Sequence, residues 1–231
     1  MIDHAMGHGG PKRSVFVVDD HPIVRHALVQ LINAQEDLCV AGEGNDVSQS
    51  LEKIRELRPD LCVIDLGLGQ SSGLDLVRVL GVEHPEIGML IISAFDETLY
   101  AERALRLGAR GFVMKHEPPG IILDAIRRVS EGTVYVSGQV ADGLLDRLGG
   151  GRNEGAEELP LNRLTDRELE VFRLLGSGRS VREIATTLSI RVKTVESHRE
   201  HLKAKLGLRS SAELLRFAIH NSQDAPLLGR N

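Results

Sequence analysis

Five short apolar runs alternate with helical patterns between residues 14 and 132, and this alternation restricts the fold more than any other feature of the chain. The runs are VFVV (15–18), LCVAG (38–42), LCVI (61–64), GMLIIS (88–93) and GFVM (111–114). After the first run, apolar residues recur at steps of three and four, at Ile23, Val24, Ala27, Leu28 and Leu31. Strands that alternate with helices form a parallel sheet covered on both faces. We therefore expect an α/β domain with a five-stranded, doubly wound parallel sheet.

Polar side chains lie at the end of four of these runs or directly after it. Asp19 and Asp20 follow the first, Asp65 the third, Ser93 ends the fourth and Lys115 follows the fifth. In such sheets functional groups gather at the carboxyl ends of the strands, so these side chains are expected to meet. Adjacent aspartates repel unless a positive charge lies between them, and Mg²⁺ prefers carboxylate oxygens. The pattern favours a magnesium site, although Asp after a strand also serves as a helix cap.

The motifs in this part of the chain resemble a known domain. VVDDHPIVRHAL, VIDL with Gly73 eight residues past the aspartate, IISA and GFVMK are similar to the receiver domain of two-component response regulators. The resemblance implies that Asp65 accepts a phosphoryl group from a sensor histidine kinase. It also implies that Asp20 and Asp65 bind Mg²⁺ directly, that Asp19 holds the ion through water, and that Gly67 offers its backbone carbonyl.

The same resemblance implies a switch. Lys115 would hold a phosphoryl oxygen, Ser93 would move to bond the phosphate, and Phe112 matches the aromatic residue that responds. Mg²⁺ and Lys115 would neutralise the charge that builds on the transferring group. One position departs from the pattern: many relatives have Pro four residues after the phosphoacceptor, where this chain has Gly69. The free backbone of GLGQSSG puts in doubt how well the site is preorganised.

Two alternatives from other classes remain open. A phosphatase of the haloacid dehalogenase type also uses an aspartate nucleophile with Mg²⁺, but it needs a second carboxylate two residues later, where this chain has Gly67. The second alternative is a receiver-type transcription factor that signals without phosphorylation. The complete set of three aspartates, Ser93 and Lys115 argues against it, and Gly69 keeps it open.

The charge is distributed unevenly along the chain. Residues 163–222 hold 12 Lys/Arg and 7 Asp/Glu, whereas residues 1–162 hold 15 and 25. An acidic front and a basic rear suggest two domains, the basic one suited to nucleic acid. We expect a flexible arm over 1–13, a receiver over 14–135, a linker with a further helical stretch over 136–162, a DNA-binding domain over 163–222 and a tail over 223–231.

Helix-capping patterns organise the basic domain. Ser or Thr is followed by Glu three residues later at Thr165–Glu168, Ser180–Glu183 and Ser210–Glu213, and each pair opens a helical pattern. The stretch LTDRELEVFRLLGSGRSVREIATTLSIRVKTVESHREHLKAKLGL is similar throughout to the LuxR-type helix-turn-helix domain. The whole chain therefore resembles a response regulator of the NarL/FixJ type, which implies a transcription factor rather than an enzyme, with at most self-phosphorylation and self-dephosphorylation.

Helical geometry divides the third helix of this domain, expected from about Lys193 to Leu206, into two faces. Val195, His198, Leu202 and Leu206 share one stripe, which is expected to face the core. By resemblance the other face lies in the major groove. The expected DNA-binding residues are Lys193, Thr194, Glu196, Ser197, Arg199, Glu200 and Lys203. A glutamate on this face can accept a hydrogen bond from a cytosine amino group or repel wrong sequences. Alternatively, Glu200 pairs with Lys203 or Lys193 on the helix surface.

The remaining expectations concern surroundings and partners. There is no apolar run long enough to cross a membrane, and the N-terminus lacks the apolar centre of a secretory signal. Cys39 and Cys62 lie in apolar runs and are expected to be buried and reduced, which suits the cytoplasm. The expected partners are a sensor histidine kinase, promoter DNA, RNA polymerase and, after phosphorylation, a second copy bound through the face of the fourth helix and fifth strand.

Overall fold

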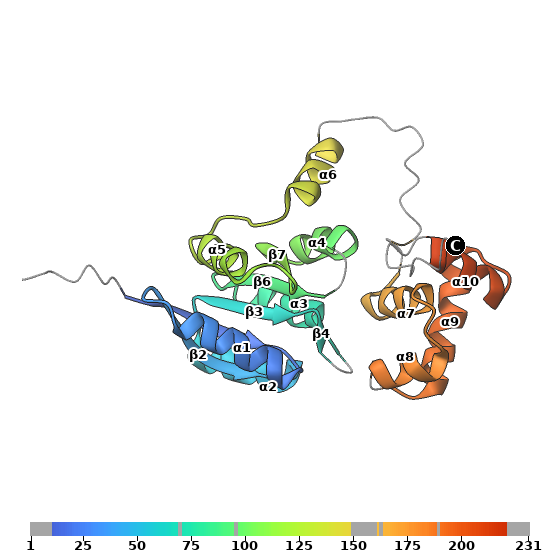
Figure 1. The fold of residues 1–231 in the computed structure, drawn as a ribbon, viewed down its shortest axis with the longest axis horizontal. Coiled ribbons are helices and arrows are strands. Elements are labelled where there is room, and N and C mark those ends of the chain that lie inside the picture. Colours follow the sequence, from blue (N-terminus) through green and yellow to red (C-terminus); the bar gives the residue numbers. More distant parts are fainter. Residues whose placement is uncertain are drawn as a thin grey trace, which may run out of the picture. The chain divides into compact units, whose positions relative to one another are not determined.

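The computed structural model describes residues 11–68, 71–94, 97–148, 161, 164–188 and 190–220. The chain forms two compact units, Met1–Gly151 and Arg152–Asn231 (Figure 1). The first contains β1 (Arg13–Val18), α1 (Pro22–Asn33), β2 (Leu38–Gly44), α2 (Val47–Leu57), β3 (Leu61–Asp65), β4 (Gly67–Leu68), β5 (Ser71–Ser72), α3 (Gly73–Glu83), β6 (Gly88–Ser93), α4 (Glu97–Arg106), β7 (Gly111–Met114), α5 (Pro119–Ser130) and α6 (Gly138–Leu148). The second contains α7 (Asp166–Gly176), α8 (Val181–Thr187), α9 (Val192–Leu206) and α10 (Ser211–His220).

The five predicted strands form one parallel sheet in the order β2-β1-β3-β6-β7. The three central strands β1, β3 and β6 are almost entirely buried, because helices cover both faces of the sheet. Burial on both faces explains why these strands appear in the sequence as continuous apolar runs rather than alternating ones. The doubly wound parallel sheet expected from the sequence is confirmed.

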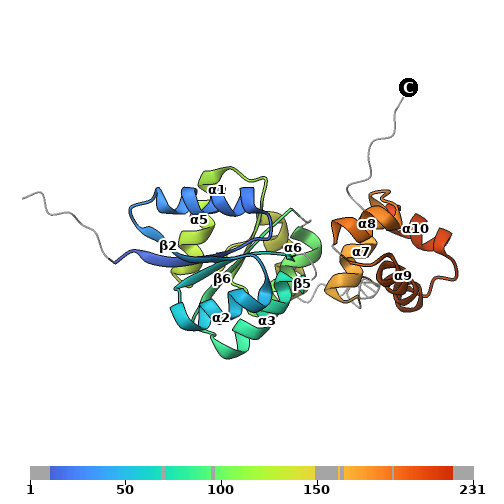
Figure 2. The ribbon, with the colours of Figure 1, turned by 90° about the horizontal axis from the view of Figure 1, so that it is seen from below.

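Helices α1 and α5 cover one face of this sheet, and α2 and α3 cover the other (Figure 2). Leu28 and Ile32 of α1 join the core between sheet and helices. Ile23 and Ala27 fit the helical spacing in the sequence, but Ile23 is 85% exposed and Ala27 is also exposed. The buried stripe of α1 therefore lies further along the helix than the first apolar residues indicate.

A two-stranded hairpin that the sequence analysis did not predict follows Asp65. Gly67 pairs with Ser72 and Leu68 with Ser71, in antiparallel register. Gly69, the departure from the family pattern, lies outside the described residues. Gly73 begins α3 against the main chain of β3, and a Cβ atom at Gly73 would lie 2.1 Å from the carbonyl oxygen of Asp65. A glycine is required there because no side chain fits between the helix and the strand.

The chain leaves α5 along the outer edge of β7. Tyr135 donates its N–H to the carbonyl of Arg110 at 2.9 Å, and its own carbonyl accepts from the N–H of Phe112 at 2.9 Å. Helix α6 then packs against α4. The hydroxyl of Ser137 donates to Glu97 at 2.5 Å and accepts from the N–H of Val140 at 3.2 Å. The predicted helical stretch within 136–162 is thus present, and it is attached to the first unit.

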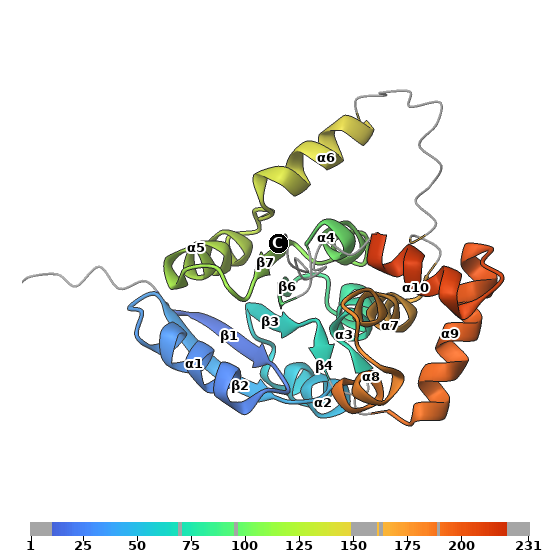
Figure 3. The ribbon, with the colours of Figure 1, turned by 45° about the vertical axis from the view of Figure 1, so that its right-hand side comes forward.

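The second unit is a small helical domain in which α7 and α8 pack against α9 (Figure 3). Phe172 of α7 and Phe217 of α10 contribute a ring pair with centroids 5.8 Å apart. Two of the three predicted capping boxes are closed, at Thr165–Glu168 and Ser180–Glu183. In the third, Ser210 accepts from the N–H of Glu213, but the Glu213 carboxylate accepts from the N–H of Arg209, one residue before Ser210. The Ser210 cap is therefore confirmed, and only the reciprocal hydrogen bond expected between Glu213 and the N–H of Ser210 is replaced by one with the N–H of Arg209.

The two cysteines differ in burial. Cys62 is fully buried, as expected, but Cys39 on the edge strand β2 is only half-buried, so the prediction of two buried thiols is wrong for Cys39. Among the described helices, none combines the length and apolarity that crossing a membrane requires. Residues 1–10 of the expected arm, 149–160 of the expected linker and the tail 223–231 lie outside the described residues.

Candidate functional site

The three aspartates expected to meet do converge at the carboxyl edge of the sheet. Asp19 and Asp20 follow β1, and Asp65 is the last residue of the neighbouring β3. Asp19 is fully buried and Asp65 is 4% exposed, whereas the side chain of Asp20 is 28% exposed. Two buried carboxylates side by side are costly unless a positive charge is close.

Lys115, which follows β7, supplies that positive charge. Its ammonium lies 2.7 Å from Asp19 Oδ2 and 2.7 Å from Asp65 Oδ2. Burial lowers the pKa of Lys115, but the charges of Asp65 and Asp19 outweigh this effect and hold the pKa above its ordinary value. The lysine is therefore charged, and it bridges residues that are 96 and 50 positions away in the sequence.

The carboxyl group of Asp65 is the most strongly perturbed acid at this edge. Burial raises the pKa of Asp65 to about 6; Lys115 opposes the shift, and the charge of Asp19 adds to it. The backbone N–H of Gly67 donates to the carboxylate and lowers the pKa slightly. The ionised form of Asp65 is thus destabilised relative to the protonated form, and additional positive charge at the site would stabilise the ionised form.

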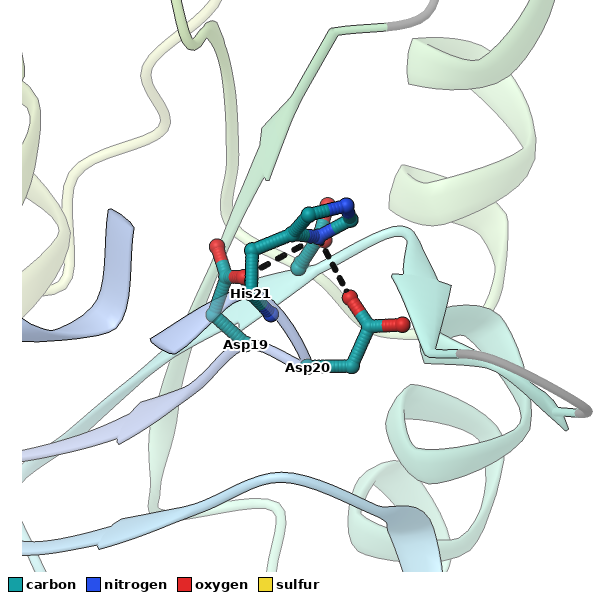
Figure 4. Close-up of side chains that lie close together, drawn as sticks. Asp19, Asp20 and His21 are labelled. Carbon is teal, nitrogen blue, oxygen red and sulfur yellow. Dashed lines mark hydrogen bonds and ion pairs between the residues drawn. The ribbon is translucent and has the colours of Figure 1, made fainter. Parts of the chain in front are cut away.

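His21 belongs to the same cluster, and the sequence analysis missed it. Its Nδ1 lies 2.6 Å from Asp20 Oδ1 and 3.6 Å from Asp19 Oδ1, and its backbone N–H donates to Asp19 Oδ1 at 2.8 Å (Figure 4). The imidazole is 68% exposed. The sequence feature that could have indicated His21 is its position directly after the two aspartates, at the start of α1.

The donor set fits a divalent cation. One ligand atom from each of Asp19, Asp20, His21 and Asp65 lies within 4.8 Å of the others. Three of these donors are carboxylate oxygens, the ligands that Mg²⁺ prefers. The ammonium of Lys115, bonded to two of the carboxylates, shows that this edge of the sheet accommodates a cation.

The expected switch residues Ser93 and Phe112 lie on β6 and β7, the two strands that follow β3 in the sheet. Ser93 is fully buried at the end of β6, and its carbonyl accepts from the N–H of Lys115 at 2.7 Å. Phe112 is 1% exposed on β7, and its backbone is bonded to Tyr135. The structure thus places Ser93 and Phe112 on adjacent strands, with Lys115 directly after the second of them, and the chain leading to α6 is hydrogen-bonded to Phe112.

In the second unit, α9 presents the residues expected to meet DNA. Lys193, Thr194, Glu196, Ser197 and Glu200 are exposed, whereas Arg199 and Lys203 are only 18% exposed in their side chains. On the opposite side Val195 and Leu202 are buried, and His198 and Leu206 are half-buried. Arg191 precedes the helix without a side-chain capping hydrogen bond.

Two ion pairs run along the exposed side of α9. Glu200 lies 2.9 Å from Lys203, which is one of the pairings that the sequence left open. Glu196 lies 2.9 Å from Arg199, a pairing that the sequence analysis did not anticipate. Each pair joins residues three positions apart, which face each other on a helix. Without DNA, both glutamates are paired with positively charged side chains of the same helix.

A parallel sheet with an acidic edge, followed by a helix-turn-helix unit, defines a regulator that joins a signal-receiving domain to a DNA-binding domain. Residues 15–127 match the model of the response regulator receiver domain, and residues 162–218 match that of bacterial regulatory proteins of the luxR family. The chain is 34% identical over 208 residues to the oxygen regulatory protein NreC of Staphylococcus aureus. The matched region covers 89% of this chain and 96% of NreC. The chain belongs to the two-component response regulators with a LuxR-type DNA-binding domain.

Solved structures agree with this assignment. A two-component response regulator of the LuxR family from an Aurantimonas species is 27% identical, with a TM-score of 0.56 over 60% of this chain and 99% of that one. RcsB from Salmonella enterica serovar Typhimurium, bound to a promoter in the presence of a phosphomimetic, is 24% identical, with a TM-score of 0.58 over 90% of this chain and 98% of RcsB. The likeness to RcsB concerns the fold. The family consists of DNA-binding regulators and not of phosphatases, so the phosphatase alternative is excluded as the class of this protein.

Proposed function

We propose that the chain is a transcription factor whose activity is switched by Mg²⁺-dependent phosphorylation of Asp65. The observation that supports this proposal is the convergence of Asp65, Asp19 and Lys115, with 2.7 Å between the ammonium and each carboxylate. In the proposed reaction a carboxylate oxygen of Asp65 forms a bond to phosphorus, while the bond from phosphorus to the histidine nitrogen of a sensor kinase breaks. A carboxylate is a suitable acceptor only when its position and the surrounding charge are arranged for it.

Each residue of the site has a role in this proposal. Mg²⁺, when bound by Asp20, Asp65 and the carbonyl of Gly67, supplies positive charge to the transferring phosphoryl group. Asp19 holds the ion through water. Lys115 exchanges one of its carboxylate partners for a phosphoryl oxygen, which its flexible side chain allows.

The proposed output is a change in dimerisation. The Ser93 hydroxyl moves onto the phosphoryl group, and Phe112 fills the space, so that the unit has two discrete packings. We propose the face of α4 and β7 as the dimer surface. Because Tyr135 and α6 of the same chain already lie there, a second copy must either displace this segment or include it in the interface.

The DNA-binding unit then binds a promoter as a dimer, with one α9 in each half-site. Lys193, Arg199 and Lys203 are proposed to meet phosphates, which gives affinity without sequence preference. Thr194, Glu196, Ser197 and Glu200 are proposed to face the bases. Because the target is the chromosome, the proposed place of action is the cytoplasm, with RNA polymerase as a partner at the promoter.

Intact-mass analysis tests the phosphorylation directly. The full chain, incubated with acetyl phosphate and Mg²⁺, should gain about 80 Da, the mass of one phosphoryl group. The gain should disappear in Asp65→Asn and on removal of Mg²⁺, and it should remain in Asp142→Asn, which removes the same charge from an exposed position on α6. A gain of mass in Asp65→Asn contradicts the assignment, and no gain in the native chain favours a receiver that works without phosphorylation.

A further inference from the structure

Arg25 is hydrogen-bonded to the main chain of the acidic site, although no motif assigned it a role. It is the fourth residue of α1, and its side chain is 18% exposed. One guanidinium nitrogen, Nη1, donates to the backbone carbonyl of Asp19 at 2.7 Å. Another, Nε, donates to the carboxylate of Glu43, near the end of β2, at 3.0 Å. Arg25 therefore links the start of α1, the loop with the two aspartates and the edge strand.

The two aspartates of this loop are restrained to different degrees. The carboxylate of Asp19 is held by Lys115 and by the N–H of His21, and the N–H of Asp19 donates to the carbonyl of Gly44 at 3.2 Å. The carboxylate of Asp20 is more exposed, and in the described part of the chain its close polar neighbour is Nδ1 of the exposed His21 imidazole, at 2.6 Å. Asp20 is therefore the ligand whose direction depends most on its backbone.

The carbonyl that Arg25 holds belongs to the peptide unit that joins Asp19 to Asp20. A peptide unit is planar, so the direction of the Asp19 carbonyl also determines the direction of the Asp20 N–Cα bond. The planar guanidinium offers donors at fixed angles and can bond the carbonyl and Glu43 at the same time, whereas a lysine ammonium is a single point of charge. Arg25 thus restrains the Asp19–Asp20 peptide unit without being one of the acidic residues of the site. We call this pair of hydrogen bonds, to the Asp19 carbonyl and to Glu43, the brace.

We propose that Arg25 is a positioning residue for the divalent cation, acting through the peptide unit between Asp19 and Asp20. This inference rests on the proposed Mg²⁺ site. Groups that orient metal ligands from the second layer commonly change metal affinity by a factor of ten or more when they are replaced. Loss of the brace lets Asp20 turn away from the direction that binds the ion, so the ion binds more weakly.

A purely electrostatic role of Arg25 predicts effects of the opposite sign. A positive charge near a cation site repels the cation, so Arg25→Gln should then tighten Mg²⁺ binding. Glu43→Gln would leave the arginine without its neutralising partner and should weaken binding. The positioning role predicts that Arg25→Gln weakens binding, and that Glu43→Gln changes it little because the amide oxygen still accepts from Nε.

The experiment is Mg²⁺ titration of the full chain by isothermal calorimetry, without a phosphodonor. Arg25→Lys and Arg25→Gln should each raise the dissociation constant for Mg²⁺ by about tenfold. The dissociation constant of Glu43→Gln should stay close to the native value. Arg55→Gln is the matched control because it removes another arginine–glutamate pair, to Glu83 at 2.7 Å, between α2 and α3. Thermal unfolding in EDTA shows whether each variant is folded, and Arg25→Lys decides the question if Arg25→Gln does not fold.

Each result has a defined meaning. Weaker binding in both Arg25 variants, with native-like binding in Arg55→Gln at a similar loss of stability, supports the brace. Native or tighter binding in Arg25→Lys and Arg25→Gln overturns it while leaving the proposed phosphorylation intact. A native chain that binds no Mg²⁺ overturns the proposed metal site and, with it, this inference.

Discussion

Replacement of Asp65 by Asn should stabilise the first unit in the absence of divalent cations. The carboxyl group is buried and has a folded-state pKa of about 6, against an ordinary value of 3.8. A raised carboxyl pKa means that the folded state binds more protons than the unfolded chain between these two values, so the free energy of unfolding falls as pH rises through this window. Asn has almost the same shape and no charge to desolvate.

The magnitude follows from the two pKa values. Above pH 7 the difference between the two pKa values corresponds to about 3 kcal/mol of lost stability, and at pH 5 about half of this remains. The figure already includes the attraction to Lys115, which opposes the shift. Asp65→Asn should therefore exceed the native chain in unfolding free energy by up to about 3 kcal/mol at pH 7.5, with the gain shrinking as pH falls towards 4.

Urea unfolding in EDTA, followed by tyrosine fluorescence, measures this difference in the intact chain. The chain has no Trp and only two Tyr, Tyr100 and Tyr135, both in the first unit, so the signal reports that unit. Asp37→Asn is a control of opposite sign: the hydrogen bond from Arg127 lowers the pKa of Asp37, so its loss should destabilise. Equal or lower stability of Asp65→Asn at pH 7.5, or a gain that grows on acidification, would refute the reasoning.

Three further predictions concern the switch, DNA reading and the linker. Ser93→Ala should abolish the shift from monomer to dimer that a phosphodonor produces in sedimentation, because the moving hydroxyl is missing; an unchanged shift would show that the hydroxyl is not the trigger. Glu196→Ala should relax base preference at one position of the DNA site, by about 1–3 kcal/mol in competition binding against single-base variants; uniform tightening would show that Glu196 only pairs with Arg199. Ser137→Ala should accelerate amide hydrogen exchange in α6 because it removes both the bond to Glu97 and the cap of the helix; unchanged exchange would show that apolar contacts alone hold α6.

The fold was predictable because its signals are local. A strand buried on both faces must be apolar at every position, which made the five strands readable as continuous runs. Helix ends were readable for a similar reason, since the Thr165 and Ser180 caps need only a partner three residues away. The β4–β5 hairpin was not predictable, because two-residue strands rich in Gly and Ser leave no periodic pattern.

The meeting of Asp19, Asp65 and Lys115 at one edge of the sheet was also predictable. Each residue ends a strand or directly follows one, and the carboxyl ends of parallel strands lie at the same edge. The sequence alone thus determined the class of domain, the order of its elements and the identity of the residues that converge. It also indicated a helical domain with a basic surface in the second half of the chain.

Only the tertiary structure decided how those residues act on one another. The pKa of Asp65 depends on burial and on charges from β1 and from the end of β7, the brace by Arg25 depends on the distance between α1 and β2, and the exposure of Ile23 depends on where α1 rests on the sheet. Local patterns are set by neighbours three or four residues away. Burial and Coulomb energies depend on distances in space between residues far apart in the chain, and those distances exist only after folding.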